Sequence, residues 1–153
     1  SEYEAIDWWD AVDYIGVSQY TPLSVADAPT DAELLAGAAS VGDRLDELSK
    51  KFSRPYLLTE VGFTAQVTAA RTPWESFDDG AAADMELQAR CYDATLKVFS
   101  TRPACAGMYW WKWFTYLPSN NSGRNRYDYP PYGKPAETVL RRWYGEIAGK
   151  RSG

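Results

Sequence analysis

The chain has 153 residues, of which 45% are hydrophobic and 24% are charged, and its formal net charge is −5. This length and balance fit one globular domain and exclude a disordered or collagen-like chain, while the negative charge disfavours nucleic acid as a partner. No apolar run approaches the ~20 residues of a membrane helix. The absence of histidine excludes Ser-His-Asp catalysis and His-based metal sites, and two cysteines are too few for a disulfide framework.

The first predicted strand–helix unit covers about residues 13–52. Residues 14–20 (YIGVSQY) indicate a short buried strand, and from Leu34 onwards apolar residues recur at the spacing of a helix. Thr30 and Glu33 have the spacing of a capping box, in which their side chains satisfy free backbone N–H groups of the first helical turn.

Two further units follow at about residues 55–100 and 105–148. Their strands are predicted at residues 55–63 (PYLLTEVGF) and 106–114 (AGMYWWKWF), and an amphipathic helix follows each strand. The last helix begins near Pro135, because proline suits a first helical turn, where its missing N–H is not needed.

Apolar strands that alternate with amphipathic helices predict an α/β fold with a parallel sheet. Residues 1–153 contain no linker or low-complexity stretch, so we expect one domain. The helix-to-strand links are short, whereas the strand-to-helix loops at 64–83 and 115–134 are long. Because functional groups of parallel α/β folds lie at the carboxyl ends of the strands, these loops are the predicted place for a site.

Glu60 is the candidate catalytic residue. It stands near the end of the apolar run LLTEVGF, where a carboxylate is costly to bury unless it has a partner or a task. The competing interpretation is a structural ion pair with an arginine at the rim of the sheet. The neighbours favour catalysis, because Tyr20 ends the preceding strand and Trp111 and Trp113 end the following one.

The aromatic content of 15%, with 7 Trp and 11 Tyr, is unusually high, and a carboxylate flanked by Tyr and Trp at the mouth of a parallel sheet suits a carbohydrate ligand. Sugars present apolar C–H faces that stack on aromatic rings, and hydroxyl groups that bond to carboxylates and phenols. For the aromatic residues of the two long loops, ordinary packing competes with sugar binding. These residues are Trp74, Tyr116, Tyr127, Tyr129 and Tyr132.

These segments together resemble clan A glycoside hydrolases, and the closest likeness is to family 113 type endo-β-1,4-mannanases. Residues 2–17 are similar to the region of the sixth barrel strand, 55–63 to the seventh, 107–113 to the eighth, and 132–144 to the closing helix. The resemblance implies the C-terminal portion, strands six to eight with their helices, of a (β/α)₈ TIM barrel. It also implies a parent enzyme that is a retaining β-glycoside hydrolase acting on β-linked oligo- or polysaccharide without a metal or organic cofactor.

The resemblance also assigns roles to individual residues. Glu60 would be the nucleophile, Tyr20 would hydrogen-bond and orient it, and Trp111 would lie under the sugar in the reacting subsite. Further substrate contacts are expected from Ser18, Trp110 and Trp113, and from Trp74 on the loop after the second strand.

One part of the family pattern is missing. A clan A enzyme carries its acid/base in an Asn-Glu pair at the end of the fourth strand, and this chain has no Asn-Glu dipeptide. Retaining hydrolysis needs two carboxyl groups ~5–5.5 Å apart. Glu75, Asp78 and Asp79, on the loop after the second strand, are alternative acids.

A whole barrel takes ~250 residues, so we expect this chain to be a fragment that is inactive alone. It would need the missing N-terminal half of the barrel, or a second chain, as its partner. Two alternatives remain open, a non-catalytic carbohydrate-binding or degenerate barrel, and a segment that acts only in assembly. Secretion and a cytoplasmic location are both left open.

Overall fold

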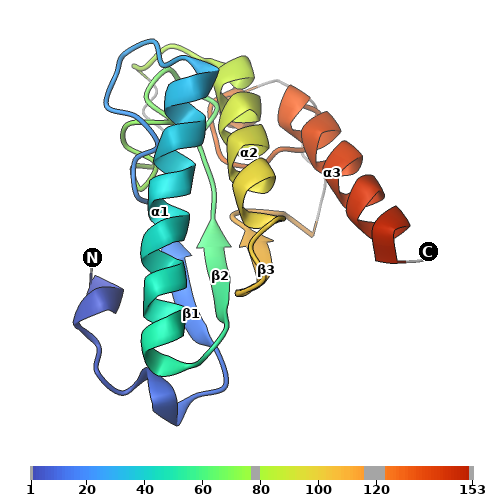
Figure 1. Cartoon of the computed structure of the whole chain (residues 1–153). Helices are drawn as coiled ribbons and strands as arrows, with labels where there is room; N and C mark the ends of the chain where they lie inside the picture. Colours follow the sequence, from blue (N-terminus) through green and yellow to red (C-terminus); the bar gives the residue numbers. More distant parts are fainter. Residues whose placement is uncertain (1, 77–79, 116–122, 152–153) are drawn as a thin grey trace.

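The computed structural model describes residues 2–76, 80–115 and 123–151, and in these residues three parallel strands alternate with three α-helices. The strands pair in the order β1-β2-β3, which confirms the predicted α/β class with a parallel sheet (Figure 1). Short 3₁₀ helices lie at Glu2–Ala5, Trp9–Ala11 and Gly123–Arg126. The strands are β1 (Ile15–Gln19), β2 (Tyr56–Val61) and β3 (Cys105–Trp110), and the helices are α1 (Asp31–Phe52), α2 (Met85–Phe99) and α3 (Pro135–Arg151).

The ends of two elements show how local chemistry sets their bounds. The predicted capping box is present at the start of α1, where Thr30 Oγ1 accepts from the Glu33 amide at 3.2 Å and Glu33 Oε2 accepts from the Thr30 amide at 2.7 Å. Strand β3 ends earlier than the apolar run predicts. The Trp111 amide still donates to the Val61 carbonyl at 2.8 Å, but the chain then leaves the sheet and Lys112 pairs with another loop.

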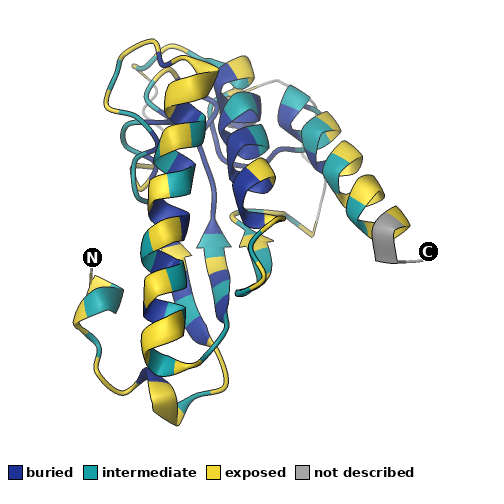
Figure 2. Ribbon diagram, viewed as in Figure 1, coloured by how far each residue is buried: buried dark blue, intermediate teal, exposed yellow. Residues whose placement is uncertain are grey.

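The three helices lie on one face of the sheet, and no helix in the described part of the chain covers the opposite face (Figure 1). Strand residues alternate accordingly, so that Ile15 and Val17 are buried toward the helices while Ser18 is exposed (Figure 2). On β3 the exposed face carries Tyr109, which is 63% exposed. The sheet therefore has one face in a core and one face uncovered.

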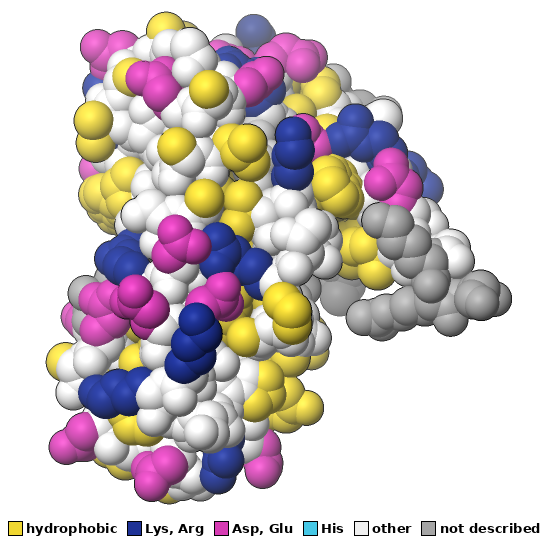
Figure 3. Space-filling model, viewed as in Figure 1, with side chains coloured by type: hydrophobic (Ala, Val, Ile, Leu, Met, Phe, Trp, Pro, Cys, Tyr) yellow, Lys and Arg dark blue, Asp and Glu magenta, His cyan; other side chains and the backbone are white. Residues whose placement is uncertain are grey.

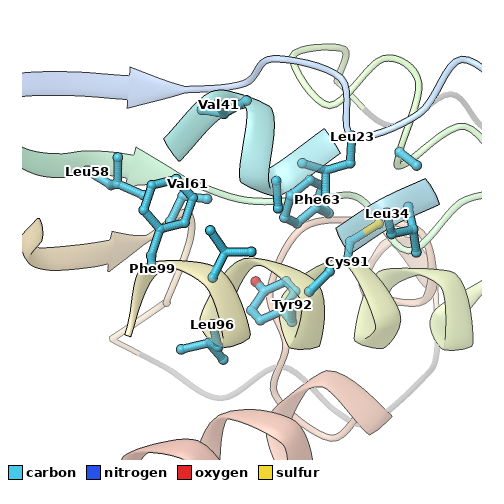
Figure 4. Close-up of a cluster of buried hydrophobic side chains, with 14 of the residues drawn as sticks. Leu23, Leu34, Val41, Leu58, Val61, Phe63, Cys91, Tyr92, Leu96 and Phe99 are labelled. Atoms are coloured by element: carbon cyan, nitrogen blue, oxygen red, sulfur yellow. The ribbon is translucent and has the colours of Figure 1, made fainter. Parts of the chain in front are cut away.

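The core fills the space between the sheet and the helices, with α2 at its centre (Figure 4). The Tyr92 ring lies edge-on to Phe63 at 6.1 Å between centroids. The Trp110 ring stacks on the Tyr92 ring, with 4.1 Å between centroids and 13° between the ring planes. Burial of each large apolar side chain stabilises the fold by about 1.5–3 kcal/mol. Other fully or almost fully buried members are Leu34, Val41, Leu58, Val61, Leu96 and Phe99.

Charged side chains of both signs mix over the helical face of the molecule (Figure 3). Arg102 is the most buried of the paired arginines, with its side chain 16% exposed, and its guanidinium binds both Asp43 and Asp46 of α1. These bonds fasten the turn before β3 to α1. Among the described residues, no helix is long and apolar enough to cross a membrane.

A buried lysine fastens the segment that precedes α3. Lys134 is 3% exposed, and its ammonium group donates to the Asp128 carbonyl at 2.6 Å. The Asp128 carboxylate pairs with Lys112 Nζ at 2.9 Å and accepts from the Tyr129 amide at 2.7 Å. Burial lowers the pKa of Lys134 to about 8, with the charge of Lys112 acting in the same direction and that of Asp128 opposing it.

Two helical glycines should respond to alanine with opposite signs. A Cβ on Gly37 of α1 would lie 1.9 Å from the Leu23 carbonyl oxygen, whereas a Cβ on Gly145 of α3 meets no described atom within 4 Å. Alanine in an open helical position stabilises by about 0.5–1 kcal/mol, so Gly145→Ala should raise the free energy of unfolding. Gly37→Ala should lower it by roughly 1–3 kcal/mol through overpacking. Urea denaturation of the full-length protein measures both, and an equal shift would contradict the packing of Leu23 on α1.

The burial of Lys134 should make stability depend on pH. The pKa of lysine is about 10.4 in an unfolded chain, and that of Lys134 in the fold is about 8. Between these values the unfolded state binds more protons, so the free energy of unfolding rises with pH. The stability of the native protein relative to Lys134→Met should increase by up to ~3 kcal/mol between about pH 7.5 and pH 10. A difference that stays constant, measured by urea denaturation at each pH, would contradict this.

Candidate functional site

A β-bulge in β2 sets the direction of the Glu60 side chain. In the pairing of β1 with β2, Val17 aligns with Leu58 and the next residue, Ser18, aligns with Glu60, so Thr59 is an extra residue on β2. Leu58 and Val61 are both buried toward the helices, although they are three positions apart. A bulge re-aims the side chains that follow it. Glu60 is thereby released from the buried face and is only partly buried.

Tyr20 is the hydrogen-bonding partner of Glu60. It follows the last residue of β1, and its hydroxyl donates to Glu60 Oε2 at 3.0 Å. Burial, followed by the hydrogen bond and the charge of Glu60, raises the pKa of Tyr20 far above its ordinary value. The phenol therefore keeps its proton near neutral pH and remains a donor to the carboxylate. Two neighbouring parallel strands thus bring together, at their carboxyl ends, the pair of residues that the sequence predicts.

The backbone of Trp111 is held against the two residues that follow Glu60. The Trp111 amide donates to the Val61 carbonyl, and a Cβ on Gly62 would lie 2.2 Å from the Trp111 carbonyl oxygen. Glycine at position 62 is therefore required for this close approach. The peptide bond between Trp111 and Lys112 is cis. Trp111 is 43% exposed, which leaves part of the residue available to a ligand.

The other predicted aromatic contacts have different surroundings. Trp113 is 52% exposed, and its ring lies edge-on to Tyr132 at 6.4 Å. Trp110 instead stacks on Tyr92 of α2, and its Nε1 donates to the Tyr144 hydroxyl of α3 at 3.0 Å. Because successive strand residues face opposite ways, Trp110 points to the helices. This packing role differs from the sugar contact that the sequence predicts.

The remaining predicted site residues lie on the open face and on the first long loop. Ser18 is exposed on β1, directly beside Glu60 in register, and Trp74 is 55% exposed on the loop that follows β2. Glu75 is also exposed on that loop. The other two alternative acids, Asp78 and Asp79, and the loop residue Tyr116 lie outside the described residues.

Two buried residues hold the site together: Gln88, which is new, and Tyr129, for which ordinary loop packing is one of the two interpretations. Gln88 of α2 is fully buried, and its Nε2 donates to the carbonyls of Phe63 at 2.8 Å and of Tyr129 at 2.9 Å. Tyr129 is 6% exposed, and its ring lies edge-on to Tyr20 at 6.4 Å. A signal for Gln88 is present in the sequence, since this amide interrupts an apolar helical face. The role of Tyr129 in the site has no such signal, because it depends on contacts with residues that are far away in the sequence.

The arrangement places one carboxylate, oriented by the Tyr20 phenol, at the carboxyl edge of a parallel sheet whose third strand is followed by the exposed residues Trp111 and Trp113. Such a group can act as a nucleophile or can hold a polar ligand whose apolar face stacks on an indole. Within the described residues, no group of three or more His, Cys, Asp or Glu side chains is placed to hold a metal ion.

Comparison with solved structures finds the same architecture in mannanases. The GH113 β-mannanase AaManA from Alicyclobacillus acidocaldarius, in complex with ManMIm, is similar at a TM-score of 0.78 and 27% identity, over 95% of this chain and 42% of that one. A second GH113 β-1,4-mannanase is similar at a TM-score of 0.76 and 25% identity, over 94% of this chain and 42% of that one. The present chain therefore spans less than half the length of these proteins.

A more distant likeness shows the fold alone. The β-glucuronidase of Faecalibacterium prausnitzii is similar at a TM-score of 0.51 and 15% identity, over 89% of this chain and 22% of that one. A comparison with curated protein sequences gives no significant match. The family model of Glycoside Hydrolase Family 113, however, matches residues 1–134, which is most of the chain. The chain therefore belongs to glycoside hydrolase family 113.

Proposed function

We propose that these 153 residues are the C-terminal portion of a (β/α)₈ barrel, strands six to eight with their helices, in a retaining β-mannanase. The family match and the mannanase neighbours, of which the chain spans 42%, support this proposal. The uncovered sheet face and the unpaired outer edges of β1 and β3 in the described sheet support it as well. The observation that carries it is the hydrogen bond from Tyr20 to Glu60 at the carboxyl ends of adjacent parallel strands.

In the proposed mechanism, Glu60 attacks the anomeric carbon of a β-1,4-linked mannosyl unit. The attack forms a covalent glycosyl-enzyme intermediate as the bond to the leaving oxygen breaks, and water then hydrolyses this intermediate with retention of configuration. Tyr20 holds Oε2 of the nucleophile by its hydrogen bond, which leaves the other oxygen to approach the sugar. Trp111 forms the platform under the reacting sugar, and Trp113 and Ser18 contact adjacent sugar units of the polysaccharide.

The acid/base of this reaction would come from a segment outside the 153 residues. It must lie ~5–5.5 Å from the nucleophile to protonate the leaving oxygen and later to activate the water. The missing N-terminal part of the barrel is the proposed source, so the chain alone would be inactive. The reaction uses neither a metal nor an organic cofactor.

The nucleophile assignment predicts a large loss of activity in Glu60→Gln. The amide keeps the shape of the side chain but cannot form the covalent intermediate, so kcat on β-mannan should fall by roughly 10³-fold or more. Glu47→Gln, an exposed site on α1, is the matched control and should keep its activity. Release of reducing sugar by the full-length protein measures both. Activity of Glu60→Gln within about tenfold of the native protein would contradict the assignment.

The location of the acid/base predicts a difference between the full-length protein and residues 1–153 alone. The full-length protein should hydrolyse β-mannan, whereas the isolated and folded segment should release no reducing sugar. Turnover by the segment would place the acid within it, with Glu75 as a candidate. Tryptophan fluorescence measures binding of mannooligosaccharides by the full-length protein. Binding without turnover would instead support a non-catalytic binding protein.

A further inference from the structure

Trp74 stands at the tip of a tight turn on the long loop that follows β2. The Glu75 amide donates to the Thr72 carbonyl at 3.0 Å, which closes a four-residue turn with Pro73 and Trp74 at its centre. Proline at the second position of a turn restricts the backbone before the turn forms. Trp74 is nevertheless 55% exposed, so the turn presents a large aromatic residue to solvent from a constrained backbone.

The Tyr129 hydroxyl holds this turn on both sides of Trp74. It lies 2.6 Å from the Pro73 carbonyl oxygen and 2.7 Å from the Glu75 carbonyl oxygen, and it donates to the two in a shared hydrogen bond. Burial, with the charges of Asp128 and Glu75 acting in the same direction, raises the pKa of Tyr129 to about 12. The hydroxyl therefore remains a donor throughout the neutral and mildly alkaline range.

Tyr129 is itself held from several elements. Its amide donates to Asp128 Oδ1 at 2.7 Å, and its carbonyl accepts from the fully buried Gln88 of α2 at 2.9 Å. Its ring lies edge-on to Tyr20 at 6.4 Å and close to the backbone of Gly62. One rigid side chain thus contacts both the turn that carries Trp74 and the tyrosine that binds Glu60.

We propose that Trp74 forms a second sugar-binding subsite and that the Tyr129 hydroxyl is the positioning group that holds it. The inference rests on the proposed function and deepens it, because it assigns a preference for β-1,4-mannooligosaccharides long enough to reach from Trp111 to Trp74. An indole on a constrained turn loses little conformational freedom when a sugar stacks on it. Short oligosaccharides that fill only the reacting subsite do not use this contact.

Kinetics of the full-length protein with mannotriose and mannohexaose test the proposal. The measured quantity is the ratio of kcat/KM for mannohexaose to kcat/KM for mannotriose. Trp74→Ala and Tyr129→Phe should each lower this ratio about tenfold, through KM for the longer sugar. The double variant should lower it no further, because the hydroxyl acts only through Trp74. Tyr14→Phe removes an exposed hydroxyl that precedes β1 and is the matched control, with an unchanged ratio.

Several results would overturn the inference while the proposed function survives. These are an unchanged ratio in Tyr129→Phe, an equal loss of kcat on both sugars, or additive effects in the double variant. An equal loss of kcat would mean that Tyr129 acts through Tyr20 and Glu60. If the unmodified protein hydrolyses neither sugar, the proposed function fails. The same ratio is then taken from dissociation constants measured by calorimetry, with the same expected tenfold fall.

Discussion

The bulge at Thr59 is the constraint on which the candidate site depends. Without the extra residue, Glu60 would keep the phase of Tyr56 and Leu58 and would point into the core between β2 and the helices. There its charge would meet apolar side chains and no solvent, at a prohibitive cost. The extra residue lets Val61 return to the core while Glu60 leaves it. The strand thus keeps its buried contacts on both sides of the carboxylate.

The hydrogen bond from Tyr20 becomes possible only because the sheet is parallel. The strands β1 and β2 end at the same edge, so the first residue after β1 reaches the end of β2 without a long loop. A hydrogen bond to a charged carboxylate is stronger than one between neutral groups, and it fixes the carboxylate in one orientation. The Trp111 backbone reaches the same edge through the hydrogen bond that its N–H donates to the Val61 carbonyl, and Gly62 provides the space. Three consecutive strand–helix units thus contribute one group each.

The sequence predicts the elements and the edge of the sheet much better than it predicts the direction of each side chain. Capping at Thr30, the helical spacing after Leu34 and the place of Glu60 at a strand end are all local properties, and the structure has the same features. Trp110 and Trp111 are adjacent aromatic residues, and the sequence predicts a sugar contact for both. They are told apart only in the structure, where Trp110 faces the helices and stacks on Tyr92 while Trp111 is exposed. The bulge leaves no mark in the composition, because a threonine fits either a regular or a bulged strand.

Tyr129 shows a second limit of inference from the sequence. Its contacts with Pro73, Glu75 and Tyr20 join segments 54 to 109 residues away along the chain, and no spacing rule connects such positions. Its buried hydroxyl must find acceptors, because an unpaired phenol in a core costs about 1–3 kcal/mol. The acceptors are two carbonyls of an exposed turn. A satisfied buried donor therefore ties the turn at Trp74 to the core, and this tie extends to the rim where a sugar would bind.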